Sequence, residues 1–360
     1  NLFFKKQNMK KKSLNAKKKI HKHLLNNLKD QRIKKIFNNF NYIIKSKFKL
    51  LDTKKIGIAV SGGPDSLALA YLIKCYILIN NTFECKCFVV DHKLRRNSSK
   101  EAITVRKLLK KFDLNCEILF WKGKKPNSNI QSKARDFRYQ LLMKACKKNK
   151  IKNLFLGHHK DDLYENFFIR LIRGSGLKGL VSLAKGDVKL SKDFVILRPL
   201  LNIEKKDLKY ISKKVFNYYI EDPSNKNLDF QRIRLRKLIK EFHKEGLNLN
   251  KLNLTIKNLN SANLSIESIV NNNIESNSKF INNKCILNEN FFCEGNEIVF
   301  RSFSEVLRRV SGRHYSARGN KISRAIKVNI LNAKMKDFTL GGCIIKKINK
   351  TLIISREKRD

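Results

Sequence analysis

Short apolar runs rich in β-branched residues alternate with longer amphipathic stretches in the middle of the chain. The runs predict buried strands at 56–60, 85–90, 116–121, 153–157 and 194–198. Helical periodicity between them predicts helices near 100–111, 130–149 and 161–173. This alternation predicts an α/β fold with a parallel, doubly wound sheet, whose ligands bind beyond the carboxyl ends of the strands.

Shifts in composition divide the chain into four expected segments. They are a basic N-terminal extension (1–50), the α/β domain (51–240), an Asn-rich helical connector (241–275) and a smaller α+β domain (276–360). In the last segment we expect strands at 284–287 and 297–300, helices at 302–310 and 321–331, and a hairpin of 338–345 with 351–354. Three interpretations of residues 1–50 stay open: a disordered electrostatic aid, a true helix, or an artefact of the start site.

The charge balance is the strongest compositional signal. The chain has 79 Lys and Arg against 30 Asp and Glu, a net charge of +49, which favours a polyanionic partner such as nucleic acid. A general bias toward Lys, Asn and Ile could produce part of this excess. The eight cysteines include no Cys-x-x-Cys pair, so we expect reduced thiols in a cytoplasmic protein. No apolar run approaches the roughly 20 residues of a membrane span.

The first motif with clear chemistry lies between the first predicted strand and the helix that follows it. It consists of Ser61, Gly62, Gly63, Pro64, Asp65 and Ser66. A glycine turn that leads into a helix directs free backbone N–H groups and the positive end of the helix dipole at one point, which suits a phosphate. The spacing differs from the common Gly-x-x-x-x-Gly-Lys-Ser/Thr and Gly-x-Gly-x-x-Gly loops. A simple glycine turn is the alternative.

A second polar cluster follows the fourth predicted strand. His158 and His159 precede a helix whose first turns carry Asp161, Asp162 and Glu165. Such a set could bind Mg²⁺, a substrate ammonium group or a proton in transit. The alternative is a capped helix with solvated acids, and a zinc site is disfavoured because no further His or Cys has suitable spacing.

Arginines form a third group of candidates. Arg135 and Arg138 share one face of a predicted helix, where a solvated basic face is an equally good interpretation. Arg173 precedes a glycine-rich stretch suited to phosphate or RNA, although a helix stop explains its first glycine. Arg232 and Arg234 belong to an alternating arginine series, in which we expect some members to pair with carboxylates and others to contact phosphate.

These motifs resemble, in their order along the chain, those of the tRNA(Ile)-lysidine synthetases. The 61–66 loop has the Ser-Gly-Gly-x-Asp-Ser form of the PP-loop ATP pyrophosphatases, an adenine nucleotide alpha hydrolase-like fold. The similarity continues through Val90–Arg95, Ala134–Tyr139, His158–Glu165, Arg173–Gly176, Arg198–Leu201 and Glu221–Asn225. The stretch from Thr339 to Cys343 looks like the family's C-terminal, tRNA-binding domain. Leu163, Asn166 and Ile233 depart from the usual pattern without replacing an ionisable group.

The resemblance implies attachment of L-lysine to C2 of the wobble cytidine in an isoleucine tRNA with a CAU anticodon. ATP would adenylate the base, and the lysine amine would displace AMP. Residues 61–66 would hold the phosphates, Asp65 would lie near Mg²⁺, and Asp161 or Asp162, with His158, would act on the lysine ammonium. We expect Arg135, Arg138, Glu165, Arg173, Arg232 and Arg234 to contact lysine or tRNA. The sequence leaves a monomer and a homodimer open.

Three other functions compete with this one. A tRNA thiolase would use reactive cysteines near the site, usually as Cys-x-x-Cys, and the chain has no such pair. A GMP or NAD synthetase would not need a charge of +49. A non-catalytic RNA-binding protein would not need a pyrophosphate loop.

Overall fold

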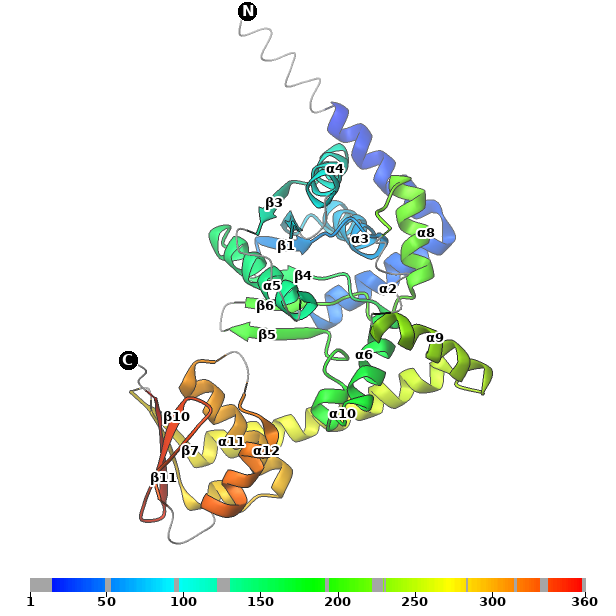
Figure 1. Ribbon diagram of the computed structural model, residues 1–360. Helices are drawn as coiled ribbons and strands as arrows, with labels where there is room; N and C mark the ends of the chain where they lie inside the picture. Colours follow the sequence, from blue (N-terminus) through cyan, green and yellow to red (C-terminus); the bar gives the residue numbers. More distant parts are fainter. Residues whose placement is uncertain are drawn as a thin grey trace, which may run out of the picture. The chain divides into compact units, whose positions relative to one another are not determined.

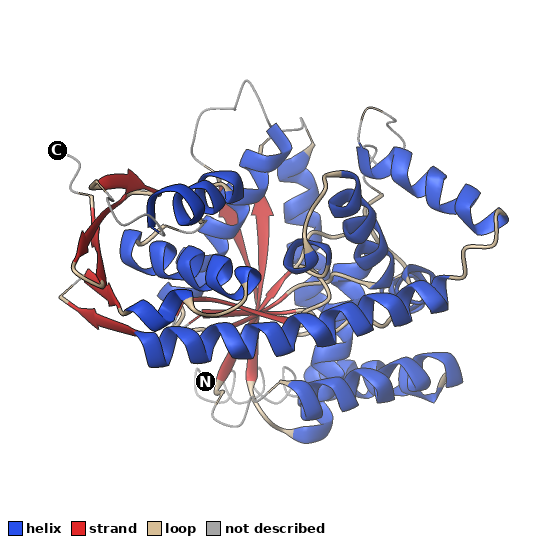
Figure 2. Cartoon of the chain, turned by 90° about the horizontal axis from the view of Figure 1, so that it is seen from below, coloured by secondary structure: helices blue, strands red, loops and turns tan. Residues whose placement is uncertain are grey.

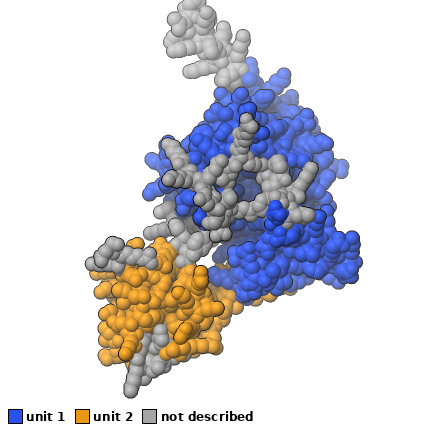
Figure 3. All heavy atoms as spheres, in the orientation of Figure 1, with its two compact units in different colours: residues 1–256 blue, residues 257–360 orange. Residues whose placement is uncertain are grey.

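The computed structural model describes residues 15–48, 53–93, 97–121, 130–191, 194–221, 229, 231–282, 284–313, 316–330 and 336–357. The chain divides into two compact units, residues 1–256 and 257–360 (Figure 3). Each unit has its own sheet and its own apolar core.

The first unit is built on a six-stranded sheet with the order β3-β2-β1-β4-β6-β5 (Figure 1). Its strands are β1 (Lys55–Ala59), β2 (Glu84–Asp91), β3 (Cys116–Phe120), β4 (Asn153–Phe155), β5 (Asp187–Ser191) and β6 (Phe194–Leu197). All neighbours pair in parallel except β5, which is antiparallel to β6 at the edge. The predicted α/β fold is confirmed, and β5 is the strand that the sequence pattern missed.

Helices cover both faces of this sheet (Figure 2). Those that contact its strands are α3 (Pro64–Asn80), α4 (Ser98–Lys111) and α5 (Ile130–Lys148), and α8 (Lys205–Phe216) packs on α3. Three more helices, α6 (Lys160–Ile172), α7 (Leu177–Leu180) and α9 (Gln231–Lys244), pack together, because α6 contacts both α7 and α9. Successive side chains of β1 point to opposite faces. Ile56 and Ile58 therefore belong to the core under α3 and α4, whereas a side chain at Gly57 would meet Leu154 and Cys146 of the second core.

The N-terminal residues differ from the expected separate extension. After a short 3₁₀ turn, η1 (Asn27–Lys29), helix α2 (Gln31–Lys47) packs in the same core as α3 and α8. Its apolar residues at helical spacing, Ile33, Phe37 and Phe40 among them, are buried. Asp30 caps α2 and accepts hydrogen bonds from Tyr210 and Lys214 of α8. The boundary expected at residue 50 is therefore corrected: the apolar face of α2 makes this segment part of the α/β unit.

Helix α10 (Leu249–Asn277) contains the division between the units. The second unit has a five-stranded sheet, order β7-β8-β11-β10-β9, made of β7 (Ser278–Ile281), β8 (Lys284–Leu287), β9 (Phe338–Leu340), β10 (Cys343–Ile348) and β11 (Thr351–Arg356). Its other elements are η3 (Glu289–Phe292), α11 (Asn296–Ser311), α12 (Gly319–Arg324) and the π-helical η4 (Ala325–Ile330).

The strand expected at 297–300 is instead the first turn of α11. Val299, Phe303, Val306 and Val310 are spaced three or four residues apart and are all buried. This spacing forms one face of a helix that covers the sheet, which a four-residue strand would not provide.

Candidate functional site

The 61–66 loop joins β1 to α3 as the sequence predicted. Gly62 has a φ of +83°, a conformation that favours glycine. Gly63 is the N-cap of α3 and provides no side-chain cap, so the first N–H groups of the helix stay available for a ligand. The Ser66 hydroxyl donates to the Gly63 carbonyl at 3.0 Å and accepts from the Ser61 N–H at 3.1 Å. These bonds fix the loop around an anion-binding helix N-terminus.

The end of β4 lies directly against this loop. A Cβ added to Gly157 would come within 3.2 Å of the Asp65 backbone and of the Ser66 nitrogen. Only a glycine allows the two chain segments this approach. The two polar motifs that follow β1 and β4 therefore form one site.

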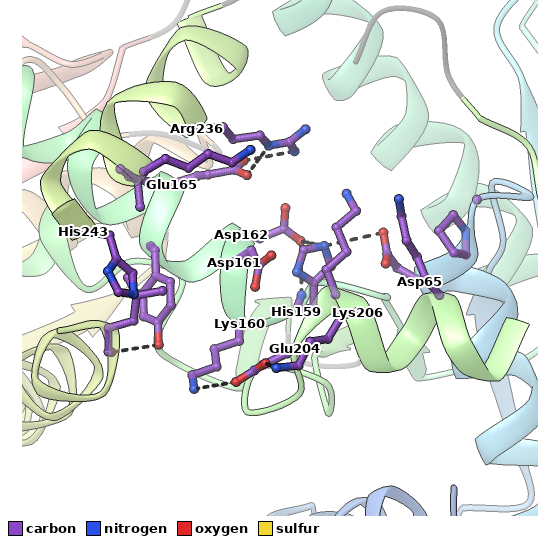
Figure 4. Close-up of a pocket in the computed structure, with 18 of the residues that line it drawn as sticks. Asp65, His159, Lys160, Asp161, Asp162, Glu165, Glu204, Lys206, Arg236 and His243 are labelled. Atoms are coloured by element: carbon purple, nitrogen blue, oxygen red, sulfur yellow. Dashed lines mark hydrogen bonds and ion pairs between the residues drawn. The ribbon is translucent and has the colours of Figure 1, made fainter. Parts of the chain in front are cut away.

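An imidazole between two carboxylates lies at the centre of the site (Figure 4). His159 is buried, and its Nε2 lies 3.5 Å from Oδ2 of Asp65 and 3.5 Å from Oδ2 of Asp162. Burial alone would lower the pKa of His159, but the neighbouring Asp65 and Asp162 raise it above its ordinary value. Oδ1 of Asp65 is buried and has no partner among the described residues.

The buried Glu165 and the half-buried Arg236 form an ion pair at another side of the site. Nε of Arg236 donates to Oε1 of Glu165 at 2.5 Å, and its Nη2 to Oε2 at 3.4 Å. Glu165 is only 3% exposed. Burial raises the pKa of the Glu165 carboxyl even though Arg236 opposes the change. The pair connects α6 to α9 and fixes the Glu165 side chain.

These groups line a cavity of about 1350 Å³. The loop contributes Ser61, Gly63, Pro64 and Asp65, and α6 contributes Asp161, Asp162 and Glu165. Cationic side chains come from Lys160 and from Lys205, Lys206 and Lys209 of α8. A cavity with both an anion-binding loop and several carboxylates can accept a phosphorylated ligand together with an ammonium group.

His158 lies in a different environment from His159. Its Nδ1 is buried and has no partner among the described residues. Burial lowers its pKa well below the ordinary value, and the charges of Arg198, Arg138, Arg135 and Arg232 lower it further. His158 is therefore a neutral imidazole in a group of arginines, and it does not join the carboxylates at the 61–66 loop.

The arginine group contains three of the predicted contacts and one that the sequence did not single out. The guanidinium groups of Arg135 and Arg138 lie over the ring of Tyr139 at 5.7 and 5.8 Å. Arg198 is buried, and its Nε has no partner among the described residues. Burial lowers the pKa of both Arg138 and Arg198. Positive charge is thus concentrated in a poorly hydrated place, which favours binding of an anion.

The remaining predicted residues lie toward the surface of α6 and α9. Arg173 donates to Oε1 of Gln231 at 3.2 Å, and Arg234 donates to the Asp229 carbonyl at 2.9 Å. Residues 222–225 of the predicted turn, and Leu94 and Arg95, lie outside the described residues.

Sequence reasoning missed the roles of His159 and Arg236. Both stand inside motifs that it had noticed: His159 next to His158, and Arg236 as the last of the alternating arginines. A capping signal could have separated the two histidines, because His159 is the N-cap of α6 and forms a capping box with Asp162, three residues later.

Comparison with known proteins places this site in a family. A family model described as the PP-loop domain matches residues 26–242, more than half of the chain. A tRNA(Ile)-lysidine synthase of a Wolbachia endosymbiont of Brugia malayi is 32% identical over 310 residues, which cover 84% of this chain and 70% of the relative. The chain belongs to the tRNA(Ile)-lysidine synthase family.

Two further comparisons agree with this family assignment. The tRNA(Ile)-lysidine synthase of Orientia tsutsugamushi is 38% identical over 218 residues, which cover 57% of this chain and 48% of that protein. The chain thus spans about half of one relative and about two thirds of the other. A solved structure of the U34-tRNA thiolase NcsA from Methanococcus maripaludis has a TM-score of 0.54 at 17% identity, over 65% of this chain and 80% of that one. This similarity shows the shared fold alone.

The described residues lack two further features. No helix there is long and apolar enough to cross a membrane. The same residues contain no group of three or more His, Cys, Asp or Glu side chains arranged to hold a metal ion by themselves.

Proposed function

We propose that this lysidine synthase family member ligates L-lysine to C2 of the wobble cytidine of a tRNA(Ile) with a CAU anticodon, at the expense of ATP. The cytoplasm, where tRNA, ATP and free lysine are available, is the proposed location. The observation that carries the proposal is the cavity that combines the 61–66 loop with the carboxylates of α6, in a chain whose relatives are named for this reaction.

The 61–66 loop is proposed to bind the ATP phosphates, and Asp65 to bind Mg²⁺. The unpartnered, buried Oδ1 of Asp65 supports a cation ligand here. Mg²⁺ is commonly held by one or two carboxylates together with substrate phosphates and water, so a single aspartate is compatible with it. When bound, the ion would neutralise charge that develops on the phosphates. His159, between Asp65 and Asp162, holds both carboxylates in place.

Asp161 and Asp162 are proposed to receive the ε-ammonium group of the lysine substrate. Both line the cavity, whereas Glu165 is already engaged by Arg236. The free amine has a pKa near 10.4, and only its neutral form is a nucleophile. A carboxylate beside the ammonium group can accept its proton as the amine attacks C2 of the activated cytidine and AMP leaves.

The arginines around His158 are proposed to bind the tRNA at the modified nucleotide. Arg135, Arg138 and Arg232 all act on His158 electrostatically. Their positive charge suits the phosphates of the anticodon loop. We further propose that the second unit, residues 257–360, binds another part of the same tRNA.

The test is incorporation of radiolabelled lysine into purified tRNA(Ile) with a CAU anticodon, in the presence of ATP and Mg²⁺. We expect one lysine and one AMP per modified tRNA. Asp65→Asn is expected to abolish AMP formation and to leave tRNA affinity within about twofold, because the side chain belongs to the phosphate site. Sulfur transfer to the tRNA, or lysine incorporation by Asp65→Asn at the wild-type rate, would contradict the proposal.

A further inference from the structure

Helix α9 has an apolar stripe that the described part of the chain only half covers. Leu235, Leu238, Ile239 and Phe242 follow the i, i+3, i+4, i+7 spacing of one helix face. Leu235 is 2% exposed, and burial of this kind is usual for the apolar residues of an amphipathic helix. Leu238 and Phe242, by contrast, are 48% and 45% exposed. Half of the stripe therefore lies open at the surface of the first unit.

The end of α6 extends this surface. The rings of Phe168 and Phe242 stack with their centroids 5.9 Å apart and their planes inclined by 27°. Leu171 and Ile172, one turn further along α6, are 51% and 62% exposed. We call the surface formed by Phe168, Leu171, Ile172, Leu238 and Phe242 the α6–α9 face. On this face the exposed ring of Phe242 lies among aliphatic side chains.

The two helices that form this face carry many exposed cations. They are Arg170, Arg173, Arg232, Arg234, Lys237 and Lys244, besides Lys240, which lines the cavity. The acidic residue nearest to Phe242 in sequence, Glu241, is paired with Lys244 at 2.8 Å. A second copy of this chain would bring the same positive charges to the contact, which disfavours self-association. The combination of an apolar ring and exposed cations suits single-stranded nucleic acid.

The adjoining glycine segment is open as well. A Cβ at Gly174 or Gly176 would meet no atom of the described residues within 4 Å. The glycine-rich stretch after α6 therefore does not serve internal packing at these two positions. It leaves room for a nucleic-acid backbone beside Arg170 and Arg173.

The same helix also lines the cavity. Arg236, Ile239, Lys240 and His243 of α9 border it. A strand with one base in the cavity would pass over α9 and bring its adjacent nucleotides to the other side of that helix. RNA sequences are usually recognised through such splayed, unpaired bases, which stack on aromatic side chains.

We propose that the α6–α9 face binds an unpaired anticodon-loop nucleotide next to the modified one, with its base stacked on Phe242 and its phosphates beside the cations of α6 and α9. The inference rests on the proposed function for the identity of the RNA. It adds a base-stacking surface outside the cavity, and it gives the exposed apolar side chains a role.

The test measures the dissociation constant of the tRNA for Phe242 variants of the full chain. Loss of one base stack, worth about 1–3 kcal/mol, predicts an increase of about 5- to 150-fold in the dissociation constant for Phe242→Ala. Phe242→Tyr keeps the ring and should stay within about twofold of wild type. Phe242→Leu separates stacking from simple apolar contact, since it should weaken binding nearly as much as alanine. Tyr42→Ala, which removes another exposed aromatic ring, 66% exposed on α2, is the matched control and should not change the affinity.

Two further measurements make each outcome decisive. Sedimentation of wild type and Phe242→Ala without RNA should give the same oligomeric state; dissociation of a homodimer by Phe242→Ala would overturn the proposal in favour of a protein interface. Wild-type affinity in Phe242→Ala, or in Phe242→Leu alone, would overturn it too. Lysine incorporation at limiting tRNA should fall in Phe242→Ala, whereas the Tyr42→Ala control should keep the wild-type rate. A wild-type protein that binds the tRNA through Phe242 but attaches no lysine would contradict the proposed function and leave the α6–α9 face supported.

Discussion

The two adjacent glycines of the 61–66 loop should respond very differently to alanine. Gly62 has a φ of +83°, and its added Cβ would lie 2.5 Å from Cγ2 of Val105 and 2.7 Å from Cδ1 of Ile220. Gly63 has a φ of −71° and only the Ser61 hydroxyl near its added Cβ, at 3.5 Å. Comparing Gly62→Ala with Gly63→Ala therefore separates two effects. Both variants lose a glycine, but only Gly62→Ala adds a strained φ and a steric clash.

The expected cost of Gly62→Ala has two parts. A left-handed alanine costs about 1–2 kcal/mol, and overpacking against the buried, β-branched Val105 costs about 1–3 kcal/mol, together about 2–5 kcal/mol. Gly63→Ala lacks both terms. It should cost about 0.5–1 kcal/mol, because alanine is a poorer N-cap than glycine.

Urea unfolding measures these two costs, and ATP binding by calorimetry reports the loop itself. We expect Gly62→Ala to lose ATP affinity as well, because the loop must move to relieve the contact with Val105. In the double variant Gly62→Ala/Val105→Ala, the contact with Val105 is relieved, but the contact with Ile220 and the strained φ remain. The two effects should therefore be less than additive, by about 1–2 kcal/mol. Equal unfolding free energies for Gly62→Ala and Gly63→Ala would refute this reasoning, since it depends on the difference between the two positions.

Three further predictions concern individual polar contacts. Arg236→Met leaves the carboxylate of Glu165 buried without this partner and should lower the free energy of unfolding by about 3–5 kcal/mol, measured in urea. Adding Glu165→Gln to this variant should restore part of the lost stability. No restoration would contradict a direct interaction between the two side chains. The fully buried Ser212 hydroxyl donates at 2.6 Å to the Pro64 carbonyl at the start of α3. Ser212→Ala should therefore raise KM for ATP more than it lowers kcat. The control is Ser46→Ala, which loses an exposed hydrogen bond of α2. The hydrogen bond from Lys214 is the main cause that lowers the pKa of Asp30. The ionised carboxylate therefore stabilises the fold above the ordinary pKa of 3.8, and this stabilisation is lost as the pH falls. The difference in unfolding free energy between wild type and Asp30→Asn should be full at pH 7 and shrink steadily in acid, and a difference that does not change with pH would contradict the prediction.

Local patterns were sufficient to predict most elements of the first unit. Short β-branched runs and helical periodicity gave the positions of β1, β2, β3, β4 and β6 and of the helices between them. The pattern failed where a short run was compatible with both structures, as at Glu297–Phe300, because four apolar or amphipathic residues do not define a period. For residues 1–50 it left three interpretations open, and the structure shows a helix, α2, in the described part of that segment.

The sequence by itself determined the chemistry of the 61–66 loop. A strand, a glycine turn and a helix N-terminus are local features, and together they favour the phosphate site that we propose here. The sequence also placed the acids of α6 after β4, and the parallel topology then required both motifs to lie at one edge of the sheet.

Only the tertiary structure decided which neighbours each polar side chain has. His158 and His159 are adjacent in sequence, yet one faces the charges of the arginines and the other lies between Asp65 and Asp162. The same is true of Arg236, whose partner Glu165 stands 71 residues earlier in the chain. The physical reason is that pKa and reactivity depend on burial and on charges a few ångströms away, and these come from segments that sequence patterns do not bring together.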